Sequence, residues 1–243
     1  MFFYFFYFLL SPLFLVLIHI GKFFNKKISI HIKNEKKTIQ HVIKNLKNID
    51  RKLKKILLFH ATSAGEFEQL KPILKHINRK SYYVIQTFSS PDIYNKEFNN
   101  PLFDISCYHP YDFFWNSYFF LKNINPTAYI ITRHDIWPFH LLIANKLDIK
   151  IFYINANLHK KSIWNQWYIS RFSKIIFKKI TFCFVPSQAI FDYAKEFINE
   201  RKIIITGDSR FDQIIERYNQ NKNIDYLPVD FLSTQNIVFG SYD

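Results

Sequence analysis

The segment from His60 to Glu66 carries the residues best suited to chemistry in this chain. It has the sequence His-Ala-Thr-Ser-Ala-Gly-Glu and directly follows the apolar run Ile56–Phe59. A glutamate held at a crevice can take a proton from an incoming hydroxyl when its pKa and reach suit the acceptor, so Glu66 is a candidate general base. Ser63 and Glu66 also have the Ser-x-x-Glu spacing of a capping box, in which each side chain satisfies a free amide of a helix's first turn. The residues by themselves leave both interpretations open.

Gly65 is one of four glycines in 243 residues. This scarcity predicts that it adopts a backbone conformation that other residues resist. The apolar run before it predicts a buried strand, and the amphipathic stretch Phe67–Ile77 predicts a helix, so Gly65 and Glu66 are expected at a strand-to-helix turn. Open α/β sheets bind their ligands at such turns.

The elements that must position these residues follow from an alternation of strand-like and helix-like segments. The expected strands are Ile56–Phe59, Tyr82–Thr87, Ile105–Tyr108, Ala128–Thr132, Ile151–Ile154, Phe182–Val185 and Ile203–Thr206. The expected helices between them include Phe113–Asn123, Phe139–Lys146, Ile163–Lys178 and Gln188–Ile198. Such alternation predicts an α/β, Rossmann-like fold with a parallel sheet. Polar clusters follow most strands, so they are expected to meet at one edge of the sheet.

Two segments precede the first expected strand. Residues Phe2–Ile20 carry no charge, and Lys22, Lys26 and Lys27 follow them. About twenty such residues span a hydrocarbon core of about 30 Å, which predicts an uncleaved single-pass anchor with the remainder in the cytoplasm. A membrane-surface or re-entrant insertion stays open as the alternative. Apolar residues at helical spacing from Ile39 to Leu53 then predict an amphipathic helix, whose basic face lies on anionic lipid or in solvent.

Composition narrows the partners. The formal charge of +14 is compatible with nucleic acid, anionic lipid or a phosphorylated substrate, and also with a general drift toward Lys, Asn, Ile and Phe. The sequence has no recognition-helix or zinc-finger pattern, so nucleic acid is not an expected partner. Cys107 and Cys183 stand in separate apolar stretches and are expected to be buried thiols. The histidines lack metal-ligand spacing, so neither a metal nor a cofactor is expected.

The chain is therefore expected to consist of an anchor in residues 1–24, a Rossmann-like acceptor-binding domain in residues 25–217, and, in residues 218–243, a linker and the start of a C-terminal donor domain. The linker covers Tyr218–Gln235, and the residues after it predict a strand that enters a turn at Gly240-Ser241, as at the start of a second α/β domain.

Five motifs make the chain resemble the 3-deoxy-D-manno-octulosonic acid (Kdo) transferases, which are membrane-anchored enzymes that add Kdo from CMP-Kdo to lipid A precursors. The motifs are His60-Ala61-x-Ser63-x-Gly65-Glu66, Tyr111-Asp112, Asp135-Ile136-Trp137-Pro138, Asn155-Ala156-x-Leu158 and Gly207-x-x-Arg210-x-Asp212. The resemblance covers essentially the whole chain but only the N-terminal half of the family. It implies a B-type glycosyltransferase of two domains, whose C-terminal donor domain would hold most contacts to the nucleotide sugar.

The resemblance also implies roles for particular residues. Glu66 matches the family's catalytic base, and Asp135 matches a functionally important acidic position. The residues expected to bind the acceptor are Ser63, Gly65, Arg133, Asn155 and Arg210. Four positions depart from the family's usual residues, namely Arg133 in place of an acid, Asn157 in place of arginine, His159 in place of serine and Asp208 in place of asparagine.

The expected function is transfer of Kdo from CMP-Kdo to a lipid A precursor at the inner membrane, as a step of lipopolysaccharide biosynthesis. In this interpretation the chain carries the acceptor half and the catalytic base. A truncated or split, non-catalytic, membrane-anchored module that binds the acceptor is the alternative. A basic membrane-surface protein that binds nucleic acid is a third interpretation, and it rests on charge alone.

Overall fold

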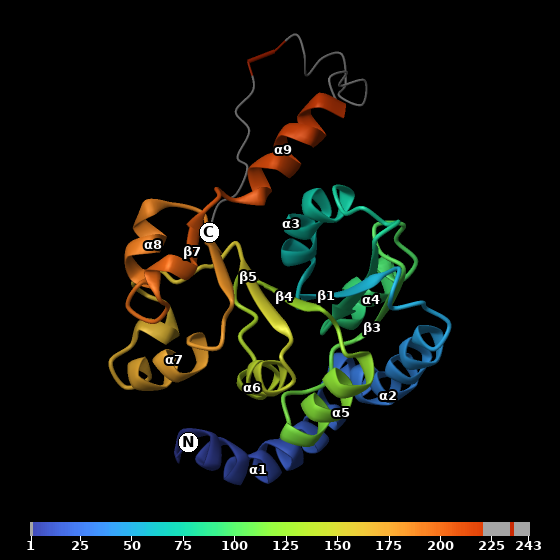
Figure 1. Cartoon of the computed structure of the whole chain (residues 1–243). Helices are drawn as coiled ribbons and strands as arrows, with labels where there is room; N and C mark the ends of the chain where they lie inside the picture. The colour runs from blue at the N-terminus through green and yellow to red at the C-terminus, as the bar shows by residue number, and fades with distance from the viewer. Residues whose placement is uncertain (1, 221–233, 236–243) are drawn as a thin grey trace.

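A seven-stranded parallel sheet forms the centre of the protein in a computed structural model that describes residues 2–220 and 234–235 (Figure 1). The strands are β1 Lys55–Ala61, β2 Tyr82–Phe88, β3 Ile105–Tyr108, β4 Ala128–Thr132, β5 Lys150–Ile154, β6 Phe182–Val185 and β7 Ile203–Ile205. Their order in the sheet is β3-β2-β1-β4-β5-β6-β7. All seven predicted strands and the predicted α/β, Rossmann-like fold are confirmed. The order reverses between β1 and β4, and ligands of such sheets bind at the carboxyl ends of the strands beside that reversal.

Helices cover both faces of the sheet. One face packs against α2 (Lys26–Leu46), α5 (Phe114–Ile124), α6 (Pro138–Lys146), α7 (Ser170–Phe177) and α8 (Gln188–Ala194), which together form the larger apolar core. The other face packs against α3 (Ala64–Lys75) and α4 (Pro91–Glu97). The helix α9 (Ser209–Gln220) lies beside α3 (Figure 1). Short 3-10 turns at Ile163–Asn165 and Glu200–Lys202 complete the described elements.

Several helices differ from their predicted bounds: α2 ends at Leu46 and not at Leu53, and α8 ends at Ala194 and not at Ile198. In two places a side chain that caps or interrupts the helix accounts for the difference. The helix predicted from Ile39 already begins at Lys26, where the side chain of Asn25 accepts from the amides of Lys27 and Ile28. The helix predicted over Ile163–Lys178 is broken, since the Asn165 side chain donates to the carbonyls of Leu158 and His159 at 3.2 and 2.7 Å and holds a turn there.

The first turn of α3 corrects the expectation for Gly65. The helix begins at Ala64, soon after β1 ends at Ala61, so Gly65 and Glu66 lie at the predicted strand-to-helix turn, within the first turn of the helix. The backbone of Gly65 does not have a positive φ, and a Cβ atom at this position would meet nothing within 4 Å. The backbone therefore does not require glycine here. The described glycine with a left-handed backbone is Gly207, with φ of +82° just after β7.

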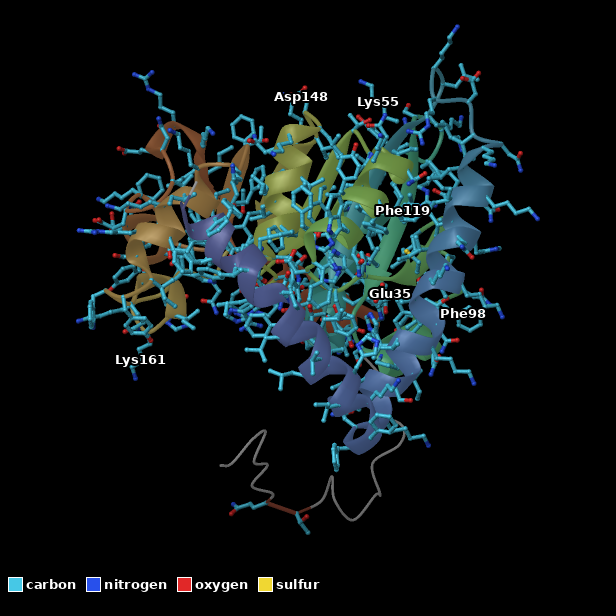
Figure 2. All side chains as sticks on the ribbon, turned by 90° about the horizontal axis from the view of Figure 1, so that it is seen from below. Glu35, Lys55, Phe98, Phe119, Asp148 and Lys161 are labelled. Atoms are coloured by element: carbon cyan, nitrogen blue, oxygen red, sulfur yellow. The ribbon has the colours of Figure 1, made fainter. Side chains whose placement is uncertain are left out.

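The first helix, α1 (Phe2–Phe24), is long and apolar enough to cross a membrane. It does not stand apart from the globular domain: it runs along α5, α6 and α7 (Figures 1 and 2). Phe3 stacks on Phe172 of α7, Tyr7 contacts Phe139 of α6 with ring centroids 4.7 Å apart, and Phe8 meets Phe114 of α5. Its C-terminal end leads into α2, where the His31 ring bonds to the carbonyl of Ser89, just after β2, at 2.8 Å.

The C-terminal part of the predicted organisation is described only in part. Helix α9 continues to Gln220, so it takes in the first residues of the predicted linker. The remainder of the linker, apart from residues 234–235, and the Gly240-Ser241 segment lie outside the described residues.

Candidate active site

Glu66 and Asp135 form a pair of buried carboxylates at the carboxyl edge of the sheet. Their side chains are 6 % and 5 % exposed. The backbone amide of Thr62, which follows β1, donates to Glu66 Oε2 at 2.9 Å and to Asp135 Oδ2 at 3.0 Å. The Thr62 hydroxyl also donates to Asp135 Oδ1. One residue at the end of β1 therefore brings together the two predicted catalytic residues, which are 69 positions apart in the sequence.

The capping box predicted for Ser63 and Glu66 is confirmed. Glu66 Oε2 accepts from the Ser63 amide at 3.0 Å, and Ser63 Oγ accepts from the Glu66 amide. Both backbone bonds to the Glu66 side chain go to Oε2, which leaves Oε1 outside the capping box. The cap thus holds the carboxylate in place without using both of its oxygens.

The environment of the pair favours a proton on Asp135. Burial, and then the adjacent negative charge of Glu66, raise the pKa of Asp135 well above its usual value. Two carboxylates this close cannot both ionise freely, so the pair retains one proton to a higher pH than an isolated carboxyl would. Such a pair is typical of sites that move protons.

Three buried histidine rings lie beneath the pair. His60 stacks on His109 with ring centroids 3.8 Å apart, and His109 stacks on His140 at 4.3 Å. Burial, followed by the charge of His140, lowers the pKa of His60 to about 3, and burial also lowers the pKa of His109. His60, which lies beside Asp135, and His109, which stacks on His60, are therefore neutral.

The tautomer of His60 follows from its partners. The Thr87 hydroxyl donates to the carbonyl of Phe59 at 3.0 Å, so it accepts from His60 Nδ1 at 2.9 Å. The unprotonated Nε2 then faces Asp135 Oδ2 at 3.7 Å. This arrangement is compatible with a protonated Asp135, because an imidazole lone pair and an ionised carboxylate would repel each other.

Asp112 forms a second acidic centre at the other end of the stack. Its carboxylate accepts from the amides of Phe139 and His140 at 3.1 and 3.0 Å, which are the first free amides of α6 after Pro138. His140 Nδ1 and the Tyr7 hydroxyl donate to it at 2.7 and 3.0 Å. Asp112 thus caps α6, whose N-cap residue Trp137 makes no side-chain bond, and ties α1 to the domain.

The residues predicted to bind the acceptor lie at the same edge, in different surroundings. Arg133 has a left-handed backbone, with φ of 56°, and its carbonyl accepts from the Tyr153 hydroxyl. Asn155 binds the side chains of Gln69 and Ser209 and so joins β5 to α3 and α9. Arg210 donates to Asp208 at 2.8 and 2.6 Å. Ser63 lies in the cap of α3, and Gly65 borders open space.

Charges around Arg133 connect these residues to the carboxylate pair. Burial acts to raise the pKa of Asp208, but the bonds from Arg210 and the charge of Arg133 lower it overall. Burial and Arg133 lower the pKa of His134, while Glu66 opposes that shift. The edge therefore presents two arginines beside two acids, a combination suited to a ligand that carries both hydroxyl and anionic groups.

A cavity of about 210 Å³ opens beside Thr62. Its wall includes Ser89, His109 and Tyr111 from the ends of β2 and β3, and Lys27 and His31 from α2. It lies between the carboxyl edge and the junction of α1 with α2. A ligand in this cavity would contact Thr62, the residue that bridges the two carboxylates.

Several residues of the site are not assigned a role by the sequence. Thr62 occupies a variable position of the first motif, and the motifs give no function to His60, His109 or His140. The sequence did contain one signal for two of these residues: His60 and His109 are polar residues at the ends of apolar strands. The described residues contain no group of three or more His, Cys, Asp or Glu side chains placed to hold a metal ion.

Solved structures with the same fold include UDP-N-acetylglucosamine 2-epimerases. The enzyme from Rickettsia bellii matches with a TM-score of 0.55 and 13 % identity over 75 % of this chain and 52 % of its own. The enzyme from Methanocaldococcus jannaschii, in complex with UDP-GlcNAc and UDP, matches with a TM-score of 0.54 and 17 % identity over 73 % of this chain and 53 % of its own. The chain thus spans about half the length of these structures, and at such identities the likeness shows the fold alone.

Comparison of the sequence with curated proteins found no match. A family described as 3-deoxy-D-manno-octulosonic-acid transferase (kdotransferase) matches residues 34–213. That range begins within α2 and ends in α9, so it contains the sheet, the carboxylate pair and the second acidic centre. With well over half of its length matched, the chain belongs to the 3-deoxy-D-manno-octulosonic-acid transferase family.

Proposed function

We propose that this chain is the acceptor-binding half of a glycosyltransferase that moves Kdo from CMP-Kdo to a lipid A precursor in lipopolysaccharide biosynthesis. The observation that carries the proposal is the Glu66 and Asp135 pair, joined through Thr62 at the ligand-binding edge of a domain of this family. The donor sugar nucleotide would be held mostly by a second, C-terminal domain.

Glu66 acts as the general base. It takes the proton from a hydroxyl of the acceptor, the resulting oxygen attacks the anomeric carbon of Kdo, and the bond to CMP breaks as CMP leaves. The raised pKa of Asp135 favours the protonated form of that carboxyl beside Glu66. Arg133 and Arg210 lie at the edge where phosphate groups of the acceptor would be bound.

The proposed location is the cytoplasmic face of the inner membrane, with α1 as the attachment. We expect a carbonate wash of membranes to leave the protein in the pellet. The single-pass arrangement stays a prediction, because α1 would have to leave its contacts with α5, α6 and α7 in order to cross a bilayer. A cysteine added ahead of Phe2 and probed with an impermeant reagent in sealed inverted vesicles distinguishes the two: spanning protects it, and surface attachment exposes it.

Glu66→Gln tests the catalytic role. The assay uses the chain fused to the donor domain of a Kdo transferase, with CMP-Kdo and a lipid A precursor as substrates. Loss of the base is expected to lower turnover by about a hundredfold or more, while the melting temperature changes little because an amide still fills much of the cap. Glu196→Gln, an exposed change of the same type, is the control. Full turnover in the Glu66→Gln variant would contradict the proposal.

A further inference from the structure

An apolar groove runs between α1 and the helices on which it lies. Its volume is about 590 Å³, and its walls include Tyr4, Phe5 and Phe8 of α1, Phe114 and Trp115 of α5, and Phe139 of α6. A second hollow of about 280 Å³ shares Phe8, Phe114 and Trp115 with it and extends past Ser11 and Pro12. The two form one trough beneath α1, here called the α1 groove, whose size is within the range of small-molecule sites.

One end of the α1 groove is cationic. Lys146, the last residue of α6, and Lys179, just beyond α7, both line it. Among the described residues neither lysine has a carboxylate within ion-pair distance. Burial, and then the charges of Lys146 and Lys178, lower the pKa of Lys179, which marks an excess of positive charge at this point.

The Tyr4 hydroxyl is a second, independent sign of a missing acceptor. It is buried in the groove wall and has no hydrogen-bond partner within the described part of the chain. The Lys179 ammonium lies 5.6 Å from the centre of the Tyr4 ring. A buried hydroxyl without a partner is costly, so a ligand that accepts from Tyr4 and faces the two lysines would remove an unfavourable contact.

We propose that the α1 groove binds an anionic glycerophospholipid of the bilayer. The acyl chain lies along the aromatic wall, and the phosphate accepts from the Tyr4 hydroxyl between Lys146 and Lys179. The lining of the groove fits both the acyl chain and the phosphate of such a lipid. The apolar wall suits a hydrocarbon chain, and the two lysines at the cationic end favour a negatively charged headgroup. This lipid holds α1 on the domain, and its site goes beyond the proposed transfer reaction.

The acceptor lipid is a poorer fit because the cationic end of the α1 groove lies at the edge of the sheet opposite to the carboxylate pair. Lys146 ends the helix that leads back to the start of β5, and Lys179 precedes β6, so both are near the amino ends of strands. Figure 2 labels Lys55 and Asp148 at that edge and Lys161 at the carboxyl edge. At about 3.3 Å per residue, the five residues of β5 separate the two edges by roughly 15 Å.

The experiment measures lipid selectivity, since an exposed apolar helix binds many lipids without distinction. The full chain is purified in detergent and incubated with equal amounts of phosphatidylglycerol and phosphatidylcholine, and bound lipids are counted by native mass spectrometry. We expect one retained phosphatidylglycerol, with at least tenfold preference over phosphatidylcholine. Inorganic phosphate at millimolar concentration is the third probe, and we expect it not to displace the lipid.

Two kinds of variant locate the site. Lys146→Gln with Lys179→Gln removes the cationic end and is expected to abolish the preference, whereas the same change at exposed Lys52 and Lys55 leaves it intact. Leu142→Trp fills the groove and is expected to reduce retention at least fivefold with all lysines present. Equal retention of the two lipids, displacement by phosphate, or an unchanged preference in the Lys146 and Lys179 double variant would overturn the proposal. None of these readouts depends on Kdo transfer.

Discussion

The two acidic centres of this protein differ in how their charge is compensated. Asp112 is surrounded by donors: two amides of α6, the ring of His140 and the hydroxyl of Tyr7. Asp135 receives only the amide and hydroxyl of Thr62 among the described residues, and it shares the amide with a second carboxylate, Glu66. The stacked rings of His60, His109 and His140 connect the two centres.

The difference indicates that Asp112 stabilises the fold, whereas Asp135 and Glu66 are candidates for proton transfer. A buried charge with a full set of donors rigidifies the elements that supply them, as Asp112 does for α1 and α6. Asp135 instead lies beside a second carboxylate, Glu66, whose charge raises the pKa of Asp135, and this is unfavourable for the fold and useful for proton transfer. Substitutions at the two centres should therefore have opposite consequences.

The largest effect on stability is expected from Asp112→Asn. It leaves His140 without its charged partner and weakens the cap of α6, so we expect the free energy of unfolding in mild detergent to fall by about 3–5 kcal/mol. Asp92→Asn makes the same change in an exposed ion pair with Lys27 and should cost about 1 kcal/mol at most. Equal effects of the two substitutions would remove the distinction between the centres.

His60→Gln tests the neutral stack through pH. The folded pKa of about 3 is below the unfolded value of 6.5, so His60 contributes stability that is present above about pH 6.5 and is lost as pH falls toward 3. Within that window one group gives a slope of about 1.4 kcal/mol per pH unit. Urea unfolding at pH 7, 5.5 and 4.5 should show a shallower acid loss for the variant. His41→Gln, at an exposed position, should retain the original slope.

Tyr7→Phe removes the hydroxyl that donates a hydrogen bond to Asp112. A hydrogen bond to a charged group contributes about 1.5–3 kcal/mol, so the amides of α1 should exchange with solvent about tenfold faster or more. Hydrogen exchange followed by mass spectrometry measures this segment by segment. Tyr168→Phe, at an exposed tyrosine, should change nothing, and unchanged exchange in the Tyr7→Phe variant would show that the bond does not hold α1.

The smallest effect is expected from Asp135→Asn, and its sign is reversed. Because the folded pKa of Asp135 is raised, its contribution to stability is present below the unfolded pKa of about 3.9 and is lost as pH rises through the folded value. Removing the carboxyl should therefore raise the free energy of unfolding at pH 8 relative to that at pH 5, compared with the unsubstituted chain. A parallel pH profile in the two proteins would mean that Asp135 is not crowded by Glu66.

Much of the fold was accessible from the sequence because buried strands leave a strong local signal. Short β-rich apolar runs marked all seven strands, and polar residues after them marked the edge where Glu66 and Asp135 meet. The capping box of α3 was accessible for the same reason, since Ser63 and Glu66 are only three residues apart.

The contacts that organise the site were not accessible, because they join residues far apart in the chain. Tyr7 and Asp112 are separated by 105 positions, and no local pattern relates them. The start of α2 was missed because lysines dominate its first turns and only Asn25 signals the cap. The prediction for Gly65 was wrong because scarcity of glycine does not by itself indicate backbone strain, and the open space beside this residue is visible only in three dimensions.

The docking of α1 also has a consequence for the order of synthesis. The helix is complete at Phe24, but its contacts include Asp112, Phe139 and Phe172, so roughly 150 more residues must be translated before its docking surface exists. At about 5–20 residues per second this interval is on the order of ten seconds, far longer than helix formation takes. During that time the ribosome presents an apolar helix with no domain to receive it. A bilayer can therefore bind α1 before the globular domain of the same chain has folded.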